Sequence, residues 1–174
     1  YEDGHPVLIF SHGSNLYGGS SSYLMRHFAS HGWIVAAPTH VGNTMTEFGG
    51  GDCDSDIASC RTLEVWYQRP QNTVAALDAL AEGADFAAYA HTNDVVLAGF
   101  SYGGYDNWAS AGGVIEHSTI EAACEAGAFD GGCTELGMDA LAMDFSDDRI
   151  RAVIPIAGAY EFPFGETGRH DVSV

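Results

Sequence analysis

The chain has 174 residues, of which 46% are hydrophobic, so it can bury one sizeable core within a single domain. It carries 24 acidic residues against 6 basic ones, for a formal net charge of −18. This charge disfavours nucleic acids and anionic membranes as partners, and the sequence contains no apolar run that reads as a membrane span or a signal peptide.

Predicted strands and helices alternate along the chain. Apolar, β-branched runs predict strands at 7–11, 33–37, 94–100 and 151–157. Helices are expected at 20–31, 70–82, 102–112, 118–127 and 135–143. Pro70 is interpreted as a first-turn residue of the second helix, where a missing N–H costs nothing. The order predicts an α/β fold with a mostly parallel sheet and helices on both faces.

A serine follows the third predicted strand in the frame Gly99-Phe100-Ser101-Tyr102-Gly103. A nucleophile held above a sheet needs a sharp bend between strand and helix, where flanking side chains would collide with the backbone. The two glycines meet that need. Because a helix N-terminus favours negative charge, Ser101 is predicted to be the nucleophile and the Tyr102 N–H an oxyanion donor.

A second motif, Phe10-Ser11-His12-Gly13-Ser14, ends the first predicted strand. In hydrolases that build the oxyanion hole from two loops, the residue at the Ser14 position supplies the second backbone N–H. His12 leads into this loop, whereas a general base must touch the serine. We therefore interpret His12 as a structural histidine.

Four segments together resemble the α/β-hydrolase superfamily: His5–Gly13, Leu24–Trp33, Ile34–His40 and Gly99–Gly104. Within it, they are similar to dienelactone-hydrolase-like and platelet-activating-factor-acetylhydrolase-like esterases, a group that includes metagenomic polyesterases. The resemblance implies a serine hydrolase that cleaves carboxylic esters through an acyl-enzyme on Ser101. Expected substrates are small-molecule or polymeric esters, with lipid-like, short-acyl or polyester character, and no cofactor is expected.

The resemblance also implies a partial domain over 1–174, in which N-terminal and C-terminal strands of the family fold are missing. The family carries its acid after the seventh strand and its histidine after the eighth, so a further C-terminal segment is expected to supply Asp and His. Within the range, Glu161 and His170 are the alternative acid and base. Residues 113–147 match nothing in the family and are expected to form a cap or an insertion.

The four cysteines show no zinc-like spacing. We favour two local disulfides, Cys53–Cys60 and Cys124–Cys133, because each would close a long loop; four free thiols in a cytosolic protein are the alternative. Disulfides would indicate a secreted or periplasmic protein.

An alternating run of aspartates, at 52, 54 and 56, resembles a calcium loop. It lacks the glycine and glutamate of an EF-hand, since Ile57 and Leu63 occupy those positions, so a solvated acidic loop and no metal site are expected.

Aromatic residues near the predicted serine suggest a substrate wall. Tyr17 and Tyr105 are the pocket candidates, with ordinary packing as the alternative. A different class of function also stays open, namely a non-catalytic binding module that keeps the α/β-hydrolase fold without a complete triad.

Overall fold

Four parallel strands form one sheet in the computed structural model, which describes residues 4–46, 63–83, 85–129, 133–157, 162–165 and 168. The strands are β1 (His5–Ser11), β2 (Ile34–Ala36), β3 (Ala90–Phe100) and β4 (Ile150–Ile156), in the order β2-β1-β3-β4. Every pair along this order is parallel. The four predicted strands and the α/β class are therefore confirmed, and the architecture is consistent with an α/β-hydrolase fold.

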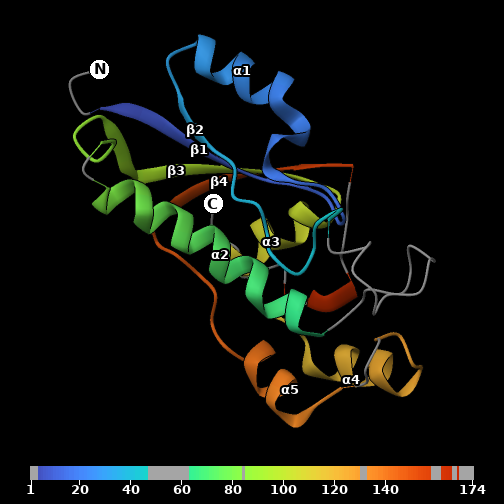
Figure 1. Ribbon diagram of the computed structural model, residues 1–174. Coiled ribbons are helices and arrows are strands. Elements are labelled where there is room, and N and C mark those ends of the chain that lie inside the picture. Colours follow the sequence, from blue (N-terminus) through green and yellow to red (C-terminus); the bar gives the residue numbers. More distant parts are fainter. Residues whose placement is uncertain are drawn as a thin grey trace.

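Helices cover both faces of the sheet (Figure 1). A 3-10 turn, η1 (Gly18–Ser21), leads into α1 (Ser22–Ser30) on one face, and α2 (Leu63–Glu82) and α3 (Tyr102–Ser110) lie on the other. Successive strand residues point to opposite faces. Accordingly, Leu8 and Phe10 of β1 pack in the cluster beside α1, and Val7 and Ile9 pack with residues of α2.

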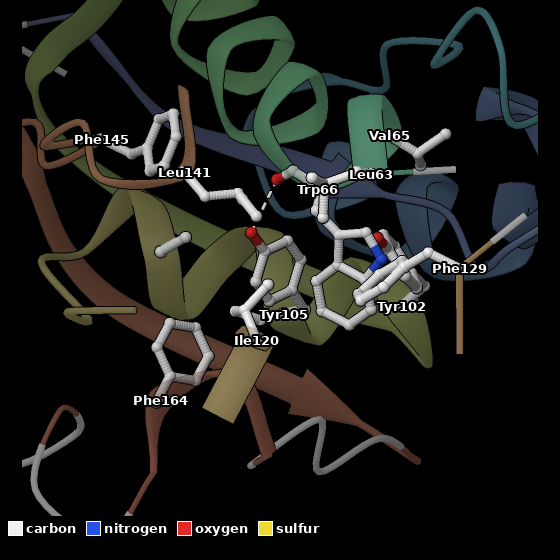
Figure 2. Packing of buried hydrophobic residues seen from close by; sticks show 11 residues of the cluster. Leu63, Val65, Trp66, Tyr102, Tyr105, Ile120, Phe129, Leu141, Phe145 and Phe164 are labelled. Carbon is white, nitrogen blue, oxygen red and sulfur yellow. Dashed lines mark hydrogen bonds between the residues drawn. The ribbon is translucent and has the colours of Figure 1, made fainter. Parts of the chain in front are cut away.

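The start of α2 differs from the prediction. The helix begins at Leu63, so Pro70 lies inside it and not in its first turn. A proline has no N–H to donate to the carbonyl four residues earlier, which here belongs to Trp66. The Tyr105 hydroxyl donates to that carbonyl instead, at 2.6 Å (Figure 2). The prediction was wrong because Leu63 and Trp66 are buried in the core, and their packing stabilises the turns before the proline.

The segment 113–147 forms α4 (His117–Glu125) and α5 (Glu135–Leu141), which lie beyond α2 and α3 as seen from the sheet (Figure 1). Ile120 and Leu141 from this segment pack in one buried cluster with Trp66 and Tyr105 (Figure 2). A second 3-10 turn, η2 (Phe162–Phe164), adds the Phe164 ring to the same cluster. The segment thus completes the core on the outer side of α2 and α3.

A disulfide joins Cys124, near the end of α4, to Cys133 before α5, with 5.8 Å between the Cα atoms. This confirms one of the two predicted pairs. Cys53 and Cys60 lie outside the described residues, as do the aspartates at 52, 54 and 56. Among the described residues, no helix is long and apolar enough to cross a membrane.

Removing this disulfide should lower the stability of the protein. Closing a loop of 9 residues restricts the unfolded chain, and the chain-entropy relation gives a loss of about 3 kcal/mol for the double variant Cys124→Ala/Cys133→Ala. Urea denaturation of the variant and of the wild type, each monitored by circular dichroism, would measure the difference. A midpoint equal to that of the wild type would show that the bond does not restrict the unfolded chain.

Candidate active site

Ser101 occupies the bend between β3 and α3 in a strained backbone conformation, with φ 53° and ψ −116°. Residues with side chains rarely adopt positive φ, and those that do cluster at functional sites; among the described residues Asn15 and Ala157 also have positive φ. The Ser101 N–H donates to the Ile156 carbonyl at the end of β4 at 2.8 Å, and its carbonyl accepts from the Gly104 N–H at 2.9 Å. The residue is partly exposed at the carboxyl end of the sheet, whereas most of α3 behind it is buried.

The two glycines of the motif are required by close approach. A Cβ at Gly99 would overlap the Gly103 carbonyl, and a Cβ at Gly103 would overlap the Ser11 carbonyl. Asn107 spans the bend when its amide oxygen faces the sheet: it then accepts from the Gly99 N–H at 2.8 Å and donates to the Gly103 carbonyl at 3.2 Å. The predicted steric reason for these glycines is therefore present in the structure.

The loop after β1 lies directly against this bend. Gly103 approaches Ser11, and a Cβ at Gly13 would come within 3.0 Å of the Phe100 ring. Ser14 is exposed, and its hydroxyl accepts from the Asn43 side-chain amide at 3.1 Å. The structure therefore brings together the segments that carry both predicted oxyanion donors, Ser14 and Tyr102.

Both ring nitrogens of His12 have partners within the fold. Its Nε2 accepts from the His40 backbone N–H at 3.0 Å, so its Nδ1 carries the proton and donates to the Gly13 carbonyl at 2.7 Å. The ring is fully buried. Through these contacts His12 stabilises the loop, as expected for the structural histidine that the sequence analysis predicts.

A group of polar side chains lies buried beneath the loop and the bend; we call Ser11, His40, Asn43, Arg69 and Asp106 the buried polar cluster. Arg69 donates from Nε to Asp106 at 2.9 Å, from Nη1 to Asn43 at 2.6 Å and from Nη2 to the Ser11 hydroxyl at 3.0 Å. It also donates from Nη2 to the His12 carbonyl. The Ser11 hydroxyl donates to Asp106 and lies 2.9 Å from His40 Nε2.

The other predicted site residues have different positions. Tyr105 is fully buried, with its hydroxyl on the Trp66 carbonyl and its ring stacked on Phe164 at 5.6 Å, so its side chain belongs to the core and not to a pocket wall. Tyr17 is 52% exposed in the loop after β1. Glu161 and His170 lie outside the described residues, and among the described ones no histidine is hydrogen-bonded to Ser101.

A separate cleft of about 510 Å³ lies away from Ser101. It is lined by Ala111–Ile115, Leu141–Asp148, Ile150 and Arg151. Ile150 begins β4, whereas Ser101 follows the carboxyl end of β3, so this cleft lies near the amino end of β4 and not at the bend that carries Ser101. Within the described ranges, no three His, Cys, Asp or Glu side chains gather in a metal-binding group.

The family model described as Chlorophyllase matches residues 2–130, about three quarters of the chain, and this range includes the bend and the loop after β1. The chain belongs to the chlorophyllase family. This is an α/β-hydrolase-like family of serine esterases, so the protein is a hydrolase of the ester-cleaving type. No curated protein and no solved structure matches the chain significantly.

The residues matched by the chlorophyllase family model also include the buried polar cluster, which was not predicted from the sequence. A signal was present: Trp66, Arg69, Thr73 and Leu77 follow one another at helical spacing on the buried face of α2. On α3, Asp106 lies among buried residues in the same way. Two opposite charges on buried helix faces predict a buried ion pair, since an unpaired buried charge is too costly.

Burial governs the protonation of His12 and of two members of the buried polar cluster, His40 and Asp106. It lowers the pKa of His12 to about 4 and that of His40 to about 2. Burial also raises the pKa of Asp106 to about 6, although the Arg69 charge acts in the opposite direction. At neutral pH both histidines are therefore neutral, and Asp106 is ionised and paired with Arg69.

These shifts predict a loss of stability at acidic pH. Between pH 6 and 4 the two histidines take up protons only on unfolding, whereas Asp106 holds a proton only in the folded state. The net uptake on unfolding is about one proton, so the free energy of unfolding should fall by roughly 1 kcal/mol per pH unit on acidification. Urea denaturation at several pH values would measure this slope.

His40→Gln removes one of the two histidines that take up a proton on unfolding and should flatten the dependence. A wild-type stability that rises on acidification would contradict the assigned protonation states.

Proposed function

We propose that this protein is a serine esterase in which Ser101 is the nucleophile. The conformation of Ser101 carries the proposal, because φ 53° at a non-glycine residue is a strain that presents a side chain at the end of a strand. The backbone N–H groups of Ser14 and Tyr102, on adjacent segments, are the proposed oxyanion donors. Family membership supports the same class of reaction.

In the proposed mechanism, a general base takes the Ser101 proton as the hydroxyl oxygen attacks the ester carbonyl. The two N–H groups stabilise the oxyanion, the alcohol leaves with a proton from the conjugate acid, and water then hydrolyses the acyl-enzyme. His12 and His40 are not the base, because the contacts of both rings lie within the fold. We propose that acid and base come from a C-terminal segment, with Glu161 and His170 as the alternative.

The proposed substrates are carboxylic esters of lipid-like, short-acyl or polyester type, bound by a surface that includes Tyr17. Chlorophyll, after which the matching family is named, belongs in any substrate panel. The Cys124–Cys133 disulfide supports a secreted or periplasmic location, since such bonds persist in oxidising compartments.

Labelling with a fluorophosphonate tests the proposal directly. An activated serine displaces fluoride and keeps the phosphonyl group, whereas a serine that is only exposed does not react. We expect one label on the full-length protein, located on Ser101 by peptide mass spectrometry and absent from Ser101→Ala. Ser22→Ala, at an exposed serine of α1, is the matched control and should still be labelled.

The alternative is a binding module that keeps the fold without a complete triad. An unlabelled wild-type protein that shows no ester hydrolysis would support this alternative and reject the esterase.

A further inference from the structure

One guanidinium group links the two segments that carry the proposed oxyanion donors. Arg69 is 1% exposed and bonds the His12 carbonyl in the loop after β1 as well as Asp106 in α3. We propose that Arg69 is a positioning residue, which sets the distance between the Ser14 and Tyr102 N–H groups. This inference rests on the proposed esterase function.

Besides its direct bond to the His12 carbonyl, Arg69 is linked to the loop through Asn43. A guanidinium can only donate, so the Asn43 oxygen must face Arg69, at 2.6 Å. The side-chain amide nitrogen of Asn43 then donates to the Ser14 hydroxyl at 3.1 Å. The backbone carbonyl of Asn43 accepts from the Asn15 N–H at 3.2 Å. Arg69 thereby fixes the orientation of the side chain that holds Ser14 in place.

The link to α3 has two parts. Asp106 lies one helical turn after Tyr102, so both project from the same face of α3. Arg69 Nε donates to Asp106, and the guanidinium carbon lies 4.8 Å from the centre of the Tyr102 ring. The same group that holds the loop therefore also contacts the first turn of α3, from which the second donor projects.

The chemistry of arginine suits this role better than that of lysine. A planar guanidinium offers five donors in a fixed fork, whereas an ammonium group is a point charge on a flexible stem. The Arg69 guanidinium donates hydrogen bonds to four groups at once: the side chains of Asp106 and Asn43, the Ser11 hydroxyl and the His12 carbonyl. Lysine keeps the charge but cannot reproduce these directions, so Arg69→Lys separates geometry from charge.

The test measures kcat and KM of the full-length protein with a p-nitrophenyl ester. We expect kcat to fall roughly 100-fold in Arg69→Lys, with KM little changed, because a small displacement of an oxyanion donor weakens binding of the transition state alone. Affinity for a trifluoromethyl ketone, which forms a tetrahedral adduct on the serine, should fall by a similar factor. Arg26→Lys, on the exposed face of α1, makes the same chemical change and should have no effect.

A second variant covers the case in which Arg69→Lys does not fold. Arg69→Gln/Asp106→Asn removes both buried charges, so no charge is left unpaired. The amount of folded protein is measured by circular dichroism, and kcat is expressed per folded molecule. A wild-type kcat per folded molecule in either variant, or a loss that appears only in KM, would overturn the positioning role.

Ser101→Ala, assayed in parallel, separates the two proposals. If it keeps the ester hydrolysis, or if the wild type has none, the esterase function fails and the role of Arg69 fails with it. If Ser101→Ala is inactive while the Arg69 variants match the wild type, only the positioning role is rejected.

Discussion

Replacing Ser101 with alanine is expected to lower kcat for ester hydrolysis by roughly 10⁴- to 10⁶-fold, because no other group then forms the acyl-enzyme. The fold should persist, because the hydrogen bonds described for Ser101 are made by its backbone N–H and carbonyl, which alanine also has. Steady-state kinetics with a p-nitrophenyl ester, together with thermal unfolding, would measure both effects.

Ser101→Gly offers a second measurement on the same backbone. Glycine adopts φ 53° without steric strain, so this variant should be as inactive as Ser101→Ala but more stable by about 1 kcal/mol. Equal stability of the two variants would contradict the strain at this bend. Hydrolysis retained by either variant would exclude Ser101 as the nucleophile.

Gly103→Ala is expected to destabilise the protein by about 4 kcal/mol or more, enough to unfold many single domains. The new Cβ would overlap the Ser11 carbonyl, which belongs to the central strand β1 and cannot move without displacing the sheet. Denaturant titration would measure the loss, and solubility would report complete failure to fold.

Gly127→Ala is the matched control for this effect. Gly127 has φ +71°, and among the described residues, its two chain neighbours aside, no atom lies within 4 Å of the place that an alanine methyl group would take. Alanine there is therefore expected to meet mainly backbone strain, worth about 1 kcal/mol. If Gly103→Ala were no more costly than Gly127→Ala, close packing would not be the reason for glycine at the bend.

Features that depend on neighbouring residues in the chain could be predicted. The four strands follow from short apolar runs, and the bend follows from two glycines around a serine. The Cys124–Cys133 pair is local as well, and the structure contains it. Each of these signals acts over a few residues, so its interpretation needs no knowledge of the tertiary fold.

Features that depend on distant contacts were missed or assigned wrongly. Pro70 is tolerated inside α2 because a tyrosine from α3 bonds the carbonyl that the proline leaves without a donor. For the same reason Tyr105 is a core residue, although its place near Ser101 suggested a pocket wall. Arg69 and Asp106 pair across two helices, and neither residue alone reveals its partner.

The bond from Tyr105 to the Trp66 carbonyl has a consequence for local unfolding. Trp66 lies in the first turns of α2, so those turns obtain a hydrogen bond from α3 that a proline-containing helix cannot make for itself. Amide protons in the two helices should therefore exchange with deuterium as one cooperative unit, and the start of α2 should open only when α3 separates from it.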